Sequence, residues 1–264
     1  MALFKYASNS NQELSKNRAH QFAQNHALMV YGANAVYSFI PKNACSTLRY
    51  SLAIHNGCID AGDDVNWIHS NNTTFQATLR EAVQANYRFV VLRCPFKRVA
   101  SVFLDKFVSK DRPSWAYHTL MGRDVSLDEL TFQDFISTLH NPKILSGDVH
   151  WTPQVNFLLY CEYSDVFSVE RFPEAESVLS EKLNFSLYDA RSLTKHGLDQ
   201  VSVVDEGMWH GVPVKELYAM KQSGMLPSYR ALYSNQLFRE VKAIYSRDVD
   251  LYASWCNSKD LLTL

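Results

Sequence analysis

The stretch FIPKNACSTLRYSLAIHNG, residues 39–57, has the order of a phosphate-binding strand, loop and helix, but it lacks the glycines that such loops usually carry. The apolar run at residues 35–40 (AVYSFI) predicts a buried strand that ends at Pro41. Residues 46–56 predict a helix, and Gly57 suits the C′ position that closes it. The polar letters KNACST therefore stand between a strand end and a helix start.

A second strand, turn and helix follow in RFVVLRCPFKRVASVFLDKFVSK, residues 88–110. Residues 88–93 predict the strand, and Pro95 suits the first turn of the helix. Helical spacing then separates two faces. The apolar face carries Phe96, Val99, Phe103 and Phe107. The polar face carries Arg98, Ser101 and Asp105, so we expect Ser101 on the open side of the helix.

The remaining pattern alternates strands with helices. We expect a crossover helix at residues 75–85, a third strand at 165–170 and its following helix at 174–183. Ser126 and Glu129 resemble a capping box that opens a helical stretch to His140, and residues 228–245 predict a terminal helix. This order predicts an α/β, three-layer, P-loop-like fold with a central parallel sheet flanked by helices.

No repeat or linker divides the chain, so we expect one domain over residues 1–264. About the first thirty residues are expected to form a loosely docked N-terminal arm. The N-terminal sequence has no apolar run long enough for a signal peptide or a membrane anchor, which favours a cytoplasmic protein. The sequence leaves open whether the chain forms a homo-oligomer.

Charge and cysteine usage exclude several classes of function. The net charge is −1 at pH 7, so no global basic field favours nucleic acid as a partner. The five cysteines form no CxxC pair and the nine histidines form no HExxH motif, which argues against a disulfide framework and against a metal site. We expect the cysteines to be reduced and mostly buried.

Both strand and helix units place anion-binding groups at the carboxyl end of the expected sheet. Lys42 to Thr47 offers backbone N–H groups, a helix dipole, two hydroxyls and an ammonium group. Arg93 and Ser101 can converge on a second anion. The loop is not a Walker A motif, because its lysine precedes the turn and its glycines are missing. A ligand with two separated anionic groups is therefore expected.

These two motifs together resemble those of sulfotransferases that use 3′-phosphoadenosine 5′-phosphosulfate (PAPS). FIPKNACSTLRYSL resembles their 5′-phosphosulfate loop, and FVVLRCPFKRVASVFLDKF resembles their 3′-phosphate motif, with Cys94 where an acidic residue or Asn is common. GDVHWTPQ, YSDVFSVERFPE and LFREVKAIYSRDVDLY are similar to segments of the Golgi chondroitin, dermatan and related carbohydrate sulfotransferases. The resemblance covers residues 35–252.

The resemblance implies a role for each matching position. Lys42, Ser46 and Thr47, with the backbone N–H groups of Asn43, Ala44 and Cys45, would hold the 5′-phosphosulfate. Arg93 and Ser101 would hold the 3′-phosphate. Lys42 would also neutralise charge on the leaving phosphate oxygen. No metal is implied, and the acceptor would be a hydroxyl of a carbohydrate or glycoconjugate.

Two histidines are the main candidates for the base that takes the proton of the acceptor hydroxyl. His69, in WIHSNN, lies between the two motifs and is the first choice; His150, in DVHWTPQ, is the second. Asp105 and His118 rank after them. Lys195 stands in a polar loop from which it could reach the cofactor.

Two other functions stay open. An ATP-dependent nucleoside or small-molecule kinase could use a similar fold, although the Walker A loop is missing. A catalytically degenerate nucleotide-binding module would keep the pocket and lack the base.

Overall fold

The chain forms two compact units in a computed structural model that describes residues 2–190, 193 and 201–264. Unit 1 comprises Met1–Arg93 and Gln154–Thr194. Unit 2 comprises Cys94–Pro153 and Lys195–Leu264. That the whole chain acts as one domain stays a prediction.

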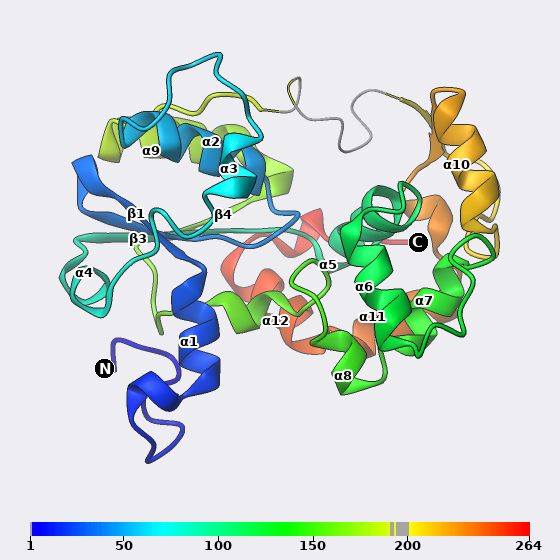
Figure 1. The fold of residues 1–264 in the computed structure, drawn as a ribbon, viewed down its shortest axis with the longest axis horizontal. Coiled ribbons are helices and arrows are strands. Elements are labelled where there is room, and N and C mark those ends of the chain that lie inside the picture. Colours follow the sequence, from blue (N-terminus) through cyan, green and yellow to red (C-terminus); the bar gives the residue numbers. More distant parts are fainter. Residues whose placement is uncertain (1, 191–192, 194–200) are drawn as a thin grey trace. The chain divides into compact units, whose positions relative to one another are not determined.

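Unit 1 contains a four-stranded sheet with helices on both faces (Figure 1). Its strands are β1 (Ala27–Val30), β2 (Ala35–Ser38), β3 (Tyr87–Leu92) and β4 (Asp165–Ser168). Its α-helices are α1 (Arg18–Asn25), α2 (Cys45–His55), α3 (Trp67–Ser70), α4 (Leu79–Gln84) and α9 (Phe172–Leu183). Its 3-10 helices are η1 (Leu14–Lys16), η2 (Tyr31–Ala33), η4 (Gln154–Phe157) and η5 (Val169–Arg171).

The strands lie in the order β1-β2-β3-β4, and β2, β3 and β4 are parallel. This confirms the predicted α/β fold with its central, mostly parallel sheet. The edge strand β1 differs, because it runs antiparallel to β2 with Ala27 opposite Ser38. The carboxyl ends of β2 and β3 lie side by side, so the chain segments that leave these two strands start from the same edge of the sheet.

Two apolar layers cover the sheet. On one face, Tyr37 and Phe89 pack with Leu48 of α2 and Leu179 of α9. On the other face, alternate strand residues such as Val36 pack with α1 and α4. Every residue of β1 and β2 is buried, which is typical of strands covered on both sides.

The N-terminal segment is not a loosely docked arm. Phe4 and Tyr6 are buried in the second apolar layer, and the segment continues into α1 and the edge strand β1. The crossover helix is shorter than predicted, because α4 begins after Thr78, whose hydroxyl and backbone form a capping box with Glu81. Residues 75–78 are outside the helix for this reason.

Unit 2 is built mainly from helices. They are α5 (Pro95–Val102), a π-helix η3 (Phe103–Phe107), α6 (Arg112–Leu120), α7 (Phe132–Thr138), α8 (Pro142–Leu145), α10 (Val214–Gln222), η6 (Arg230–Leu232), α11 (Asn235–Ile244), α12 (Ser246–Trp255) and η7 (Ser258–Asp260). Two short parallel strands, β5 (Ser202–Val204) and β6 (Met225–Pro227), accompany them and were not predicted.

Aromatic side chains form the core of unit 2. Phe107 and Phe135 lie with their ring centroids 4.5 Å apart, and Trp151 lies 5.7 Å from Phe107 and 5.8 Å from Phe135. The predicted helix start at Ser126 is wrong, because the capping box of α7 is formed by Thr131 and Asp134. The predicted terminal helix is confirmed only from Asn235 onward.

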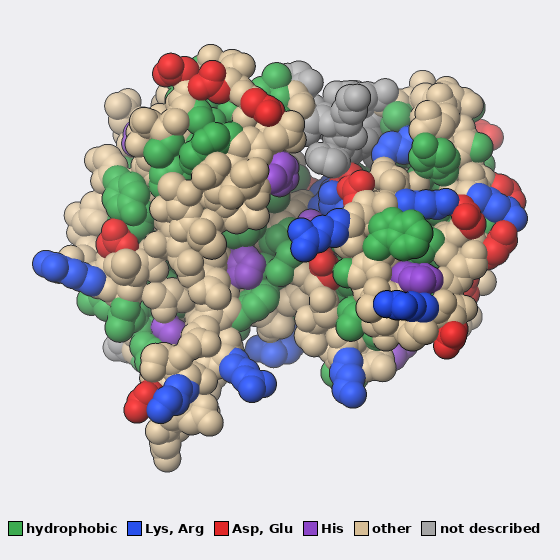
Figure 2. All heavy atoms as spheres, in the orientation of Figure 1, with side chains coloured by type: hydrophobic (Ala, Val, Ile, Leu, Met, Phe, Trp, Pro, Cys, Tyr) green, Lys and Arg blue, Asp and Glu red, His purple; other side chains and the backbone are tan. Residues whose placement is uncertain are grey.

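All five cysteines are free thiols, as predicted, but only Cys94 is buried. No helix among the described residues is long and apolar enough to cross a membrane. On the face shown in Figure 2, acidic side chains lie among the basic ones over the helices of unit 2. Such mixing agrees with the net charge of −1.

Candidate functional site

The loop between β2 and α2 has an unusual backbone for a segment without glycine. Lys42 and Ala44 both adopt positive φ angles, 72° and 55°. Alternation of left-handed and right-handed residues turns successive backbone N–H groups toward one point, an arrangement that binds anions. Ala44 is also the N-cap of α2, whose first N–H groups have no acceptor within the helix. The backbone of residues 42–47, called the anion loop below, therefore suits the predicted binding of an anion.

Asn43 is the buried anchor of this loop. Its backbone N–H donates to the Ile40 carbonyl at 3.2 Å, which closes the turn. Its side-chain amide donates to the Val91 carbonyl at 2.9 Å, near the end of β3. The sequence assigned the Asn43 N–H to an anion. The hydrogen bond to Ile40 competes with an anion for the Asn43 backbone N–H. The hydrogen bond from the Asn43 side chain to Val91 fastens the loop to the sheet.

Gln154 ties the loop to the end of β3, and the sequence did not single it out. Its Oε1 accepts hydrogen bonds from the Asn43 side chain at 2.6 Å and from the Arg93 backbone N–H at 3.0 Å. Its Nε2 donates to the Arg93 carbonyl at 2.9 Å. Gln154 is fully buried. The Arg93 guanidinium in turn donates to the Lys42 carbonyl at 2.8 Å, so Arg93 lies against the anion loop.

The two predicted hydroxyls lie in the first turn of α2. Ser46 is half-buried and Thr47 is buried. Thr47 Oγ1 accepts a hydrogen bond from the Ala190 N–H at 3.3 Å, and Ser51 Oγ accepts one from the Tyr188 N–H at 2.7 Å. The segment that ends at Ala190 is therefore fastened along α2. Lys195 lies beyond it, outside the described residues.

A buried arginine supports the segment that carries His69. Arg49 of α2 donates hydrogen bonds to the Ile68 carbonyl and to the Asn72 side chain, and its guanidinium lies 5.2 Å from the centre of the Phe39 ring. Burial lowers the pKa of Arg49 from its usual value. His69 itself is exposed on the four-residue helix α3. The sequence placed Arg49 only within a helix and did not reveal this role.

In unit 2, the predicted polar face along α5 and η3 is buried, so the expected open position of Ser101 is wrong. Arg98, Ser101 and Asp105 are each 4% exposed or less. Arg98 donates to the Thr152 carbonyl at 2.9 Å and to the Val149 carbonyl at 3.3 Å. The Ser101 hydroxyl donates to the Arg98 carbonyl at 2.7 Å. A loop some fifty residues later covers this face, which helical spacing alone could not indicate.

His150 lies in that loop, in contact with a carboxylate. Its Nδ1 lies 2.6 Å from Asp148 Oδ1. Burial raises the pKa of Asp148. The hydrogen bonds and the charge of His150 lower it by more, so the pKa of Asp148 lies below its usual value. Asp148 therefore stays ionised at neutral pH, and His150 has a fixed negative partner.

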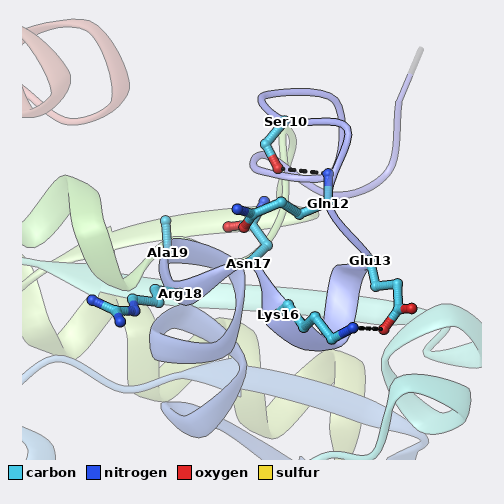
Figure 3. A pocket seen from close by; sticks show the side chains of 7 residues that line it. All are labelled: Ser10, Gln12, Glu13, Lys16, Asn17, Arg18 and Ala19. Atoms are coloured by element: carbon cyan, nitrogen blue, oxygen red, sulfur yellow. Dashed lines mark hydrogen bonds and ion pairs between the residues drawn. The ribbon is translucent and has the colours of Figure 1, made fainter.

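A separate hollow of about 750 Å³ lies beside η1 and the start of α1 (Figure 3). Its rim includes Glu13 and Lys16, whose charged groups pair at 3.0 Å. None of the predicted anion-binding residues lines this hollow. Within the described ranges, no group of three or more His, Cys, Asp and Glu side chains is arranged to hold a metal ion.

The left-handed backbone at Ala44 gives a direct stability prediction. Ala44→Gly should raise the free energy of unfolding by up to about 1 kcal/mol, because glycine adopts positive φ without a Cβ penalty. Chemical denaturation measures the change. The matched control is Ala116→Gly on the exposed side of α6, which should lower the free energy of unfolding by about 1 kcal/mol. Equal destabilisation by both changes would contradict the prediction.

Comparison with known proteins connects these features to one family. The family model described as "Sulfotransferase family" matches residues 25–253, which include the anion loop, Arg93, Ser101 and His150. No solved structure matches the chain significantly.

Curated relatives match over part of the chain. Carbohydrate sulfotransferase 10 of Xenopus laevis is 27% identical over 149 residues, covering 46% of this chain and 42% of that protein. Carbohydrate sulfotransferase 14 of Homo sapiens is 26% identical over 161 residues, covering 54% of this chain and 43% of that protein. The Mus musculus protein of the same name matches to the same extent. The matches thus span less than half the length of these relatives.

Proposed function

Because the chain belongs to the sulfotransferase family, we propose that it transfers a sulfuryl group from PAPS to a hydroxyl of a carbohydrate or glycoconjugate. The observation that carries this proposal is the anion loop, in which Lys42 and Ala44 take positive φ and Gln154 fastens the loop to Arg93. The carbohydrate acceptor is supported by the names of the curated relatives.

The donor groups of the loop fit a phosphosulfate. Residues 39–47 contain no carboxylate, while the first turn of α2 supplies N–H groups and the Ser46 and Thr47 hydroxyls. The Lys42 ammonium adds a positive charge. We propose that Lys42, Ser46, Thr47 and the N–H groups of the first turn bind the 5′-phosphosulfate.

Arg93 and Ser101 are proposed to bind the 3′-phosphate. Arginine presents a planar fork that suits phosphate oxygens, and a serine hydroxyl can add one further hydrogen bond. Contacts to a group remote from the sulfur would distinguish PAPS from ATP and help to orient the sulfuryl group. Lys195 stays a candidate for an additional cofactor contact.

The proposed reaction is an in-line displacement. The acceptor oxygen forms a bond to sulfur while the bond from sulfur to the bridging phosphate oxygen breaks, and 3′,5′-adenosine diphosphate (PAP) leaves. Lys42 would stabilise the charge on that phosphate oxygen. A base, His69 or His150, would take the acceptor proton.

Calorimetric titration of PAP into the protein tests the donor site. We expect PAP to bind at least 10-fold more tightly than ADP, because only PAP carries the 3′-phosphate, and a charged hydrogen-bonded contact is worth about 1.5 to 3 kcal/mol. Arg93→Ala should remove this preference, and Ser101→Ala should reduce it. Absence of PAP binding, or tighter binding of ATP with magnesium, would contradict the proposal and favour a kinase.

A further inference from the structure

Arg49 carries a buried positive charge that no carboxylate of the described residues neutralises. The residue is 8% exposed. Its guanidinium donates hydrogen bonds to the Ile68 carbonyl and to the Asn72 side-chain oxygen, and both acceptors are neutral. The described part of the chain gives Arg49 no ion pair with Asp or Glu. A buried charge without an opposite charge is costly, because the protein interior solvates it less well than water does.

This charge lies beside the anion loop, within unit 1. Arg49 follows Cys45 by four residues in α2, so the two side chains lie on one face of the helix, a turn apart. Long helical side chains extend toward the N-terminal end of their helix. The guanidinium also lies 5.2 Å from the centre of the Phe39 ring, and Phe39 precedes Lys42 by three residues. The positive charge is therefore close to the segments on both sides of the turn.

The surroundings of Arg49 supply no negative charge of their own. Residues 39–57 contain neither Asp nor Glu. Tyr37 is close enough to affect the pKa of Arg49, although burial has the larger effect. The Tyr37 hydroxyl is itself buried and has no hydrogen-bond partner among the described residues. Burial raises the pKa of Tyr37 well above its usual value, so this hydroxyl stays neutral at neutral pH.

We propose that Arg49 is the buried counter-charge of the anion held by residues 42–47; this rests on the proposed function, in which that anion is the 5′-phosphosulfate of PAPS. Arg49 acts through its charge across the first turn of α2 and does not need to touch the ligand. Because the guanidinium is buried, water and salt weaken this attraction less than they would at the surface. The effect of Arg49 should therefore grow with the negative charge placed in the loop.

Two substitutions of Arg49 separate its charge from its hydrogen bonds. Arg49→Gln removes the charge and keeps an amide donor, whereas Arg49→Lys keeps the charge. Calorimetry measures binding of PAP and of adenosine 3′-phosphate, which lacks the 5′-phosphate. We expect PAP binding to weaken about 10-fold in Arg49→Gln and less than about threefold in Arg49→Lys. Adenosine 3′-phosphate should bind both variants within about threefold of the parent, since it places no charge in the loop.

The control for the change in net charge is Arg80→Gln. Arg80 is an exposed arginine of α4, so its substitution removes the same charge from unit 1 away from the anion loop. Both affinities should stay unchanged in this variant.

Asn72→Asp tests the proposal without altering Arg49, and it serves if Arg49→Gln does not fold. Asn72 is exposed, and its side-chain oxygen already accepts a hydrogen bond from Arg49, so a carboxylate there would pair with the guanidinium. PAP binding should weaken by roughly 3- to 10-fold, while the free energy of unfolding should not fall. Asn72→Ala removes the hydrogen bond without adding a charge and should bind PAP within about threefold of the parent.

Three results would overturn the counter-charge: equal losses of PAP affinity in Arg49→Gln and Arg49→Lys, equal losses for PAP and adenosine 3′-phosphate, or unchanged PAP affinity in Asn72→Asp. If the parent does not bind PAP, the proposed function fails instead. Inorganic pyrophosphate then tests Arg49 alone. Pyrophosphate binding that weakens about 10-fold in Arg49→Gln would support the counter-charge. A parent that does not bind pyrophosphate, or equal binding by parent and variant, would refute it.

Discussion

Replacement of Lys42 by methionine should lower the kcat of sulfuryl transfer by about 100- to 1,000-fold. Methionine keeps much of the length of the lysine side chain and removes its charge. The ammonium group would stabilise the phosphate oxygen as the bond to sulfur breaks, so its largest effect is expected in the transition state. PAP affinity should fall by only about 10-fold, since Lys42 is proposed to contact the 5′-phosphate as well, and this one contact is a small part of PAP binding.

The experiment compares initial rates of ³⁵S-sulfate transfer with PAP dissociation constants from calorimetry. Lys42→Arg should recover part of the rate. It restores the positive charge, but a planar guanidinium cannot replace the compact ammonium group in shape. Lys16→Met, at a lysine whose side chain is 70% exposed beside η1, is the matched control and should leave both quantities unchanged. A kcat of Lys42→Met within threefold of the parent would refute the role of Lys42.

Local patterns predicted the elements that carry the site. The apolar run before Pro41 and the run before Arg93 became the parallel strands β2 and β3, each within one or two residues of its predicted end. Pro95 begins α5, and Gly57 follows α2 with a positive φ of 74°. These features depend on residues that are near one another in sequence, so strand periodicity and helix-end preferences were sufficient to find them.

Other features of the site depend on partners distant in sequence or on uncommon backbone angles. Gln154 meets Arg93 across 61 residues and Asn43 across 111 residues. Ser101 is buried on the helix from which Arg98 holds a loop that comes more than fifty residues later in the chain. The left-handed angles at Lys42 and Ala44 could not be inferred, because neither residue type usually adopts them.

Replacement of Gln154 by methionine should lower the free energy of unfolding by roughly 3 to 5 kcal/mol and weaken PAP binding at least 10-fold. Methionine has a similar volume, so the change removes the hydrogen bonds without opening a large cavity. The Arg93 N–H and carbonyl and one hydrogen bond of Asn43 would lose their buried partner, and each unsatisfied group costs about 1 to 3 kcal/mol.

Chemical denaturation and PAP calorimetry measure these two effects of the Gln154 change. Gln236→Met, at an exposed glutamine of α11 that bonds only to Glu240 among the described residues, is the matched control and should change stability by less than about 0.5 kcal/mol. If Gln154→Met were as stable as the parent, its hydrogen bonds would not hold the loop. If it were destabilised but bound PAP normally, the left-handed turn at Lys42 and Ala44 would form without Gln154. A fall in both stability and PAP affinity would show that the buried Gln154 amide holds the loop in its binding conformation. Glycine-rich phosphate loops reach such a conformation through the backbone freedom of glycine.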